Sequence, residues 1–117
     1  MSRRSVGREY ESLAAAYLKK QGYTLLEKNF TCRQGEIDLI AREGEYLCFV
    51  EVKYRTTTHS GDPVEAVTPV KQARIIRTAQ VYLLARGLGD DVKCRFDVIG
   101  ITPGSVRLIR NAFALPW

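Results

Sequence analysis

The chain has 117 residues, of which 45% are hydrophobic and 26% charged, and its formal net charge is +5. These values are ordinary for a globular protein, so they exclude a largely disordered chain, and we expect a single domain over residues 1–117. No run of about 18 apolar residues is present, and the N-terminal residues lack the apolar stretch of a signal peptide. We therefore expect a cytoplasmic protein with no membrane partner. The small basic excess is compatible with a polyanionic partner such as nucleic acid.

Hydrophobic periodicity predicts a helix followed by three strands in the first half of the chain. Apolar residues recur at helical spacing over residues 5–21, and Gly22 stands where a C-terminal cap is expected. Residues 23–30 are a plausible strand. Residues 36–41 and 46–53 are two further strand candidates, the second rich in β-branched and aromatic residues. The short polar segment between these two contains glycine, so we expect them to form a hairpin.

The second half is expected to add one long helix and one or two strands. After a polar loop at residues 56–62, Thr68 supplies a capping hydroxyl before Pro69, and this helix is expected to run to about Arg86. Residues 92–101 alternate well enough for a fourth strand, and residues 106–109 form a short candidate fifth. This order predicts an α/β fold in which helices flank a mixed β-sheet.

Charged residues interrupt the two strands of the predicted hairpin. Side chains alternate along a strand, so Glu36 and Asp38 are expected to share one face, as are Glu51 and Lys53 on the neighbouring strand. A hairpin loop of two or four residues places Asp38 directly opposite Glu51. The same register places Glu36 opposite Lys53, and opposed Cβ atoms are roughly 5 Å apart. Two carboxylates at that distance repel by about 3 kcal/mol at an effective dielectric constant of 20.

Three arrangements can relieve this repulsion. One acid can stay protonated, a lysine can neutralise the pair, or a divalent cation can bridge the two carboxylates. In the second case, Lys53 and Glu36 simply form a cross-strand ion pair on a solvated face. Leu47 and Phe49 lie on the same predicted face as Glu51, however, and charges beside apolar residues indicate the wall of a cleft.

A divalent cation at this position has a known chemical use. Mg²⁺ or Mn²⁺ can be held by one or two carboxylates, here Asp38 and Glu51, and still leave coordination positions for water and phosphate oxygens. Such an ion polarises a phosphodiester and lowers the pKa of an attacking water. Lys53 can orient that water or offset charge in the transition state. Glu36 either helps to position the water or Lys53, or is the ion-pair partner of that lysine.

Two segments resemble the signature of the YraN-like family of bacterial proteins: Gly35-Glu36-Ile37-Asp38-Leu39-Ile40-Ala41 and Phe49-Val50-Glu51-Val52-Lys53-Tyr54-Arg55. The resemblance continues in order through Asn29-Phe30, Gly61-Asp62-Pro63, Lys71-Gln72, Arg95-Phe96-Asp97-Val98 and Asn111-Ala112-Phe113. The family in turn resembles the restriction-endonuclease-like nucleases with a PD-(D/E)xK motif, especially the archaeal Holliday-junction resolvases. The resemblance therefore implies a restriction-endonuclease-like fold over nearly the whole chain.

The same resemblance implies roles for individual residues. It implies three metal contacts and one catalytic residue: Asp38, Glu51, the backbone carbonyl of Val52, and the catalytic Lys53. The related resolvases also use a glutamate of the first helix, and the matching residue here is Glu11. A solvated position on the flank of the helix is the alternative for this residue. Family members often have a small residue before that glutamate, whereas this chain has Tyr10, which we expect to fill the core rather than stack on a base.

Basic residues near these positions are candidates for binding a phosphate backbone. Lys71, Arg74 and Arg77 recur every three residues on one side of the second helix. Such a row can follow phosphates, although charges on the outer side of an amphipathic helix are usually just solvated. Arg55 directly follows the third strand and is the better candidate. Gln72 faces the apolar side of its helix, so it can hydrogen-bond inside the domain or reach the site.

The leading expectation from the sequence is a metal-dependent endonuclease acting on nucleic acid, with DNA as the expected partner. The preference for branched DNA comes from the resemblance alone. Two other classes fit the same residues: a nucleic-acid-binding module of this fold without turnover, and a non-enzymatic scaffold whose acids only form ion pairs. A resolvase-like enzyme is also expected to pair into a homodimer, because it cuts two strands symmetrically.

Overall fold

The computed structural model describes residues 3–56, 63–89 and 91–114. The elements follow the order α1 (Arg3–Lys20), β1 (Thr24–Cys32), β2 (Gly35–Glu43), β3 (Tyr46–Tyr54), η2 (Pro63–Ala66), α2 (Pro69–Ala85), β4 (Cys94–Thr102) and β5 (Ser105–Phe113). This order confirms the predicted α/β architecture, and only the short 3₁₀ helix η2 was not expected. Most of the loop predicted at residues 56–62, with the motif residues Gly61 and Asp62, lies outside the described residues.

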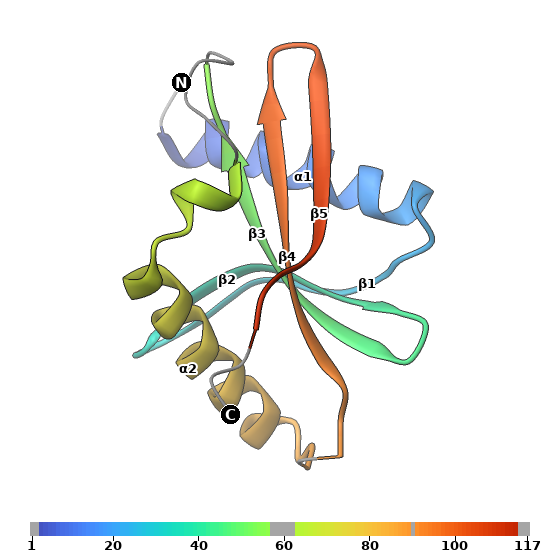
Figure 1. Ribbon diagram of the computed structural model, residues 1–117, viewed down its shortest axis with the longest axis vertical. Coiled ribbons are helices and arrows are strands. Elements are labelled where there is room, and N and C mark those ends of the chain that lie inside the picture. The colour runs from blue at the N-terminus through green and yellow to red at the C-terminus, as the bar shows by residue number, and fades with distance from the viewer. Residues whose placement is uncertain (1–2, 57–62, 90, 115–117) are drawn as a thin grey trace.

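The described strands form one mixed sheet in the order β1-β2-β3-β4-β5. Neighbouring strands are antiparallel except for β3 and β4, which are parallel. The chain between these two strands includes α2, and Figure 1 shows α2 in front of the sheet and α1 behind it. Each helix covers its own core, one around Phe49, Phe96 and Ile76, the other around Leu18 and Val50. The middle strands β3 and β4 are therefore buried on both faces, which explains their long apolar runs.

Local signals fix the two helices where the sequence predicts them. Thr68 has an extended backbone and its Oγ1 accepts a hydrogen bond from the Lys71 N–H at 3.3 Å, so it caps α2 as expected. Gly22 and Gly87 follow the helices with positive φ angles of 98° and 66°, a conformation that glycine adopts without steric cost. Neither these helices nor η2 has the length and apolar composition needed to cross a membrane.

The fifth strand is much longer than the predicted segment 106–109. It extends from Ser105 to Phe113, and its register against β4 shifts between Phe96 and Val98. Asn111 has a positive φ of 53°, so the strand is irregular at this residue. Such an irregularity interrupts the two-residue alternation by which a strand is recognised in a sequence, which is why the second half of β5 was missed.

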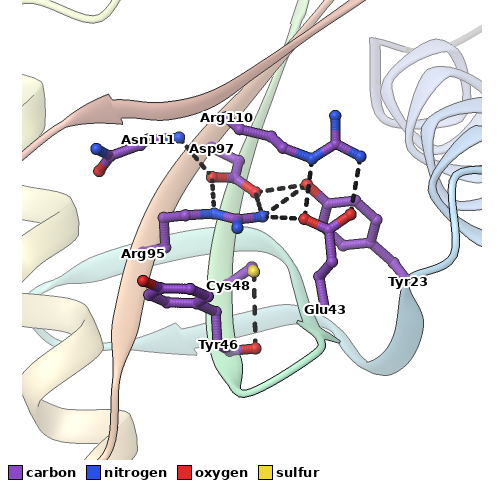
Figure 2. Close-up of polar contacts among 8 residues, drawn as sticks. All are labelled: Tyr23, Glu43, Tyr46, Cys48, Arg95, Asp97, Arg110 and Asn111. Carbon is purple, nitrogen blue, oxygen red and sulfur yellow. Dashed lines mark hydrogen bonds and ion pairs between the residues drawn. The ribbon is translucent and has the colours of Figure 1, made fainter.

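A buried aspartate ties β4 and β5 to the segment between α1 and β1. Asp97 is only 1% exposed, and its carboxylate accepts hydrogen bonds from the Tyr23 hydroxyl at 2.7 Å and from the Asn111 N–H at 2.9 Å. The Arg95 guanidinium donates two more, both at 2.9 Å. Figure 2 shows these groups converging on one carboxylate. The buried charge is thus paired and fully hydrogen-bonded, as a stable interior requires.

Glu43 extends this network to the end of β2. Its carboxylate accepts hydrogen bonds from Arg110 at 2.8 and 2.9 Å and from Arg95 at 2.6 Å (Figure 2). These contacts, above all the hydrogen bonds from Arg110, lower the pKa of Glu43 to about 2. The network therefore connects three strands at the end of the sheet where the β2–β3 hairpin turns.

The substitution Asp97→Ala is expected to reduce the free energy of unfolding by about 3 kcal/mol or more, because it leaves the guanidinium of Arg95 partly unpaired in a site where that side chain is only 12% exposed. Urea unfolding measures the loss. The control is Glu45→Gln, which breaks an ion pair with Lys93 whose side chains are 65% and 57% exposed, and which should cost less than about 1 kcal/mol. Equal costs for the two variants would contradict a structural role for Asp97.

Candidate functional site

The candidate site lies where β2 and β3 separate. Their antiparallel pairing runs from Glu43–Tyr46 to Leu39–Val50. This confirms the predicted hairpin and selects the two-residue loop, Gly44 and Glu45, over the four-residue alternative. Beyond this point β3 stays paired with β4 as far as residue 54, whereas the first residues of β2 pair with β1 alone. Figure 1 shows the result: β1 and β2 extend to the left while β3 continues upward beside β4. The two strands thus form a fork.

Asp38 occupies the branch point of this fork. Its Oδ2 accepts a hydrogen bond of 2.8 Å from the backbone N–H of Val52, so a carboxylate replaces the strand-to-strand contact at this position. Ile37 packs in the core beneath α2, but Leu39, two residues later, packs in the core beneath α1. The predicted strict alternation of side chains is therefore wrong at Asp38, because the strand twists there and turns the carboxylate toward β3.

Three carboxylates gather at the fork. One carboxylate oxygen from each of Glu11, Glu36 and Asp38 lies within 4.8 Å of the other two. Glu11 extends from α1, and the other two belong to β2. The group includes the glutamate that the resemblance alone selected, although Glu51 is not a member. A pocket of about 460 Å³ adjoins it, lined by Gly7, Arg8, Glu11, Asn29, Thr31 and Glu36.

Asn29 of β1 is a member of the site to which the sequence assigned no role. Its side chain hydrogen-bonds the carboxylate of Glu11 and thereby lowers the pKa of that acid. The register of β1 and β2 places Asn29 opposite Asp38, and its φ is positive at 55°. The signal in the sequence was an asparagine inside a strand, where asparagine is disfavoured unless the backbone is irregular.

Burial and neighbouring negative charges raise the pKa of Asp38 to about 8. Burial is the largest cause and the charge of Glu51 the second, while the hydrogen bond from Val52 acts in the opposite direction. Burial also raises the pKa of Glu11, despite its contact with Asn29. Without a cation, the group therefore keeps a proton on Asp38 near neutral pH, which is the first of the three arrangements that relieve carboxylate repulsion.

Glu51 and Lys53 lie on the face of β3 that points toward α2. The Lys53 Nζ is 3.3 Å from the Glu51 Oε1, and the two side chains are 20% and 16% exposed. Lys53 therefore neutralises Glu51 on its own strand, and the predicted partner Glu36 lies in the acidic group instead. Burial lowers the pKa of Lys53, but its contact with Lys71 and the nearby carboxylates raise it overall, so this lysine is charged at neutral pH.

Other cations surround Lys53 on the same side of the fork. Lys71, in the first turn of α2, is close enough for the Lys53 ammonium to lower its pKa, and Arg55 lowers it further. Arg55 is half-buried, and its N–H donates to the carbonyl oxygen of Ile101 at 2.9 Å, which continues the contact of β3 with β4. Three of the predicted cationic residues are thus near one another, and their mutual repulsion favours binding of an anion.

The remaining two phosphate-binding candidates have structural contacts. Gln72 donates its Nε2 to the carbonyl oxygen of Val67 at 2.9 Å, so its amide hydrogen-bonds inside the domain. Arg74 is exposed, but the aliphatic part of its side chain packs against Gly35 at the start of β2. The contact is so close that a Cβ added to Gly35 would lie 2.9 Å from the Arg74 Cγ. Glycine at this position lets α2 approach β2 closely.

Tyr10, the bulky residue that precedes Glu11, stacks on Tyr54 at the end of β3. The ring centroids are 3.8 Å apart and the ring planes differ by 14°. Tyr10 is only partly buried and Tyr54 is 37% exposed, so the prediction that Tyr10 fills the core holds for one side of its ring only. The tyrosine does not keep α1 away from the fork, because Glu11 still reaches the other two carboxylates.

The sequence is similar to a family of bacterial proteins. Residues 10–101 match the uncharacterised protein family UPF0102, which confirms the resemblance to YraN-like proteins. A UPF0102 protein of Lachnoclostridium phytofermentans is 50% identical over 113 residues, which cover 97% of this chain and 96% of the relative. One from Chlorobium chlorochromatii is 53% identical over 96 residues, or 82% of this chain and 73% of the relative. One from Nitrosococcus oceani is 44% identical over 114 residues, or 94% and 92%.

In the metal-free protein, Asp38→Asn is expected to raise the melting temperature at pH 8.5 by about 4 °C or more, and to change it little at pH 4. The folded protein holds the Asp38 proton more tightly than the unfolded chain, so its stability falls as pH rises from about 4 to about 8. Asparagine cannot ionise and still accepts the hydrogen bond of Val52. Thermal unfolding in EDTA at both pH values tests this, with Glu45→Gln as the control. If Asp38→Asn melts at a lower temperature than the wild type at pH 8.5, the ionised Asp38 carboxylate does not destabilise the folded protein and the prediction is wrong.

Proposed function

Because the chain belongs to the uncharacterised protein family UPF0102, we propose a function from the chemistry of its fork: metal-dependent hydrolysis of phosphodiester bonds in nucleic acid, with DNA as the substrate. The observation that carries the proposal is the group of Glu11, Glu36 and Asp38, in which one carboxylate oxygen of each residue lies within 4.8 Å of the other two. Lys53 is close enough for the charge of Asp38 to contribute to raising its pKa. Carboxylates held this close are costly unless a proton or a cation is present.

The donor set fits Mg²⁺ or Mn²⁺, because these ions prefer carboxylate oxygens to nitrogen or sulfur. Asp38 and Glu11 would hold the ion, and Glu51 and the carbonyl of Val52 are the further contacts that the resemblance implies. Asp38 would release its proton on binding, since metal ligands must be deprotonated. When bound, the ion would supply Lewis-acid polarisation of the phosphodiester and activation of a water.

The remaining residues of the fork have separate roles in this proposal. Asn29 holds the Glu11 carboxylate in place through its hydrogen bond. Lys53 carries positive charge against the phosphoryl group, where negative charge grows during the reaction. Arg55 and Lys71 bind the phosphates that flank the scissile bond. Glu36 lines the 460 Å³ pocket, where its carboxylate would accept a hydrogen bond from a water.

We also propose that the fold is of the restriction-endonuclease-like type. The mixed sheet, a helix on each face, and acidic and lysine residues at the point where β2 and β3 separate support this assignment. A homodimer that cuts two strands symmetrically belongs to the same proposal and is tested by sedimentation of the protein with and without DNA.

Mn²⁺ is expected to raise the melting temperature of the wild-type protein at pH 7.5, because an ion that binds only the folded state stabilises it by about 2.7 kcal/mol at 100 times its dissociation constant. Asp38→Asn should abolish most of this increase, whereas Lys53→Met should retain it, since Lys53 is not a ligand. Thermal unfolding over a Mn²⁺ titration measures the effect. An equal increase in Asp38→Asn would place the ion elsewhere.

Cleavage of DNA in the presence of Mn²⁺ or Mg²⁺ is expected to fall by at least about 100-fold in both Asp38→Asn and Lys53→Met. The first removes a ligand of the ion, and the second removes the positive charge that offsets the negative charge growing on the phosphoryl group. The substrates are a duplex and a four-way junction of equal length, and gel electrophoresis measures the products. Glu45→Gln is the control and should cleave at the wild-type rate.

The outcomes separate the candidate functions. Undiminished cleavage by purified Asp38→Asn would assign the activity to another site or a contaminant. Salt-sensitive DNA binding without product, in a protein that does bind Mn²⁺, would favour the binding module instead.

A further inference from the structure

The stacked pair formed by Tyr10 and Tyr54 borders the fork on the side of α1. Tyr10 directly precedes Glu11 on the helix, and Tyr54 directly follows Lys53 on the strand. The rings are nearly parallel, with centroids 3.8 Å apart, and the hydroxyl of Tyr54 hydrogen-bonds that of Tyr10. Two aromatic rings are thus held in a fixed orientation next to residues of the candidate site.

This pair remains accessible although it contains large apolar surfaces. Tyr54 is 37% exposed, and Leu13, one helical turn beyond Tyr10, is 48% exposed. The other stacked pairs, Phe49 on Phe96 and Phe96 on Phe113, contribute to the core beneath α2. The tyrosine pair is therefore a surface feature, and burial alone does not explain why its rings are aligned.

The surroundings of the pair are those of a nucleotide-binding surface. Arg8, which lies on α1 like Tyr10, lines the pocket beside Glu11, whereas Lys53 and Arg55 precede and follow Tyr54 in the chain and lie toward α2. Cations beside an exposed aromatic face can hold a phosphate while the ring stacks on the attached base. Tyr54 is three residues from Glu51, or roughly 10 Å along an extended strand, which is about three nucleotide steps of 3.4 Å.

We propose that the Tyr10–Tyr54 pair is a stacking platform for an unpaired nucleobase, and that the substrate class is therefore DNA with an unpaired base within about three nucleotides of the phosphate that is cut. A base inside an uninterrupted duplex is already stacked on its neighbours and cannot reach the platform. This inference rests on the proposed function, because it names the substrate of the same site.

The test compares the affinity of the protein for two DNAs in EDTA, where cleavage is not required. One is a fully paired duplex, and the other is the same duplex with a single unpaired 2-aminopurine, a fluorescent adenine analogue. The wild type should bind the second at least about fivefold more tightly and quench its fluorescence, since stacking on an aromatic side chain contributes about a factor of five or more per base.

Three substitutions separate stacking from other effects. Tyr54→Ala should abolish the preference and the quenching, and should leave affinity for the paired duplex within about twofold. Tyr54→Phe should retain both, because the ring face is preserved. Tyr46→Ala is the matched control, since Tyr46 is also 37% exposed and lies at the opposite end of the same strand. It should behave as the wild type.

Each outcome decides between the two proposals. Equal binding of both DNAs by the wild type, or a preference that survives in both Tyr54→Ala and Tyr10→Ala, overturns the platform. A preference that depends on Tyr54, in a protein that cleaves neither DNA with Mn²⁺, supports the platform and overturns the nuclease. Metal-dependent cleavage of both DNAs at equal rates, with no difference in affinity, supports the nuclease and overturns the platform.

Discussion

The hydrogen bond from the Val52 N–H to the Asp38 carboxylate determines where β2 and β3 separate. Where two strands separate, the backbone N–H and C=O groups that no longer pair between them need other hydrogen-bond partners. For the N–H of Val52 this partner is the Asp38 Oδ2, at 2.8 Å. The same exchange turns Asp38 out of the regular alternation of β2 and brings it to Glu11 and Glu36. The fork and the acidic group therefore have one cause, which is the replacement of a strand contact by a carboxylate.

The buried Asp97 and the partly buried Asp38 have opposite environments. Asp97 accepts hydrogen bonds from the side chains of Tyr23 and Arg95 and from the Asn111 N–H, so its charge is compensated. Asp38 receives one hydrogen bond and has three glutamates nearby, which raise its pKa together with burial. The motif residues of β4 and β5 thus belong to the fold, whereas perturbation of the kind found at Asp38 is typical of functional sites.

Charges of opposite sign reach the fork from different elements. The acidic group and the tyrosine pair involve α1, while Lys53, Lys71 and Arg55 lie toward α2. Under the proposed function, a nucleic acid crossing the fork would meet cations for its phosphates on one side and carboxylates that hold a cation on the other. The two sets are close enough to interact, since the negative charge of Asp38 is among the causes that raise the pKa of Lys53.

Short-range patterns in the sequence determined the order of the elements, the Thr68 cap, and a hairpin with an even loop of two or four residues, whose register brings Asp38 near Glu51. Each depends on residues that are neighbours in the chain, so periodicity and turn chemistry are enough to predict it. The tertiary structure alone decided that β2 twists at Asp38, that Lys53 pairs with Glu51, and that Asn29 holds Glu11. The contacts of Asp38 and Asn29 join segments far apart in the chain, at positions where the backbone is irregular and alternation no longer predicts the direction of a side chain. Lys53 pairs with its near neighbour Glu51 because Glu36, the partner predicted from the sequence, lies in the acidic group.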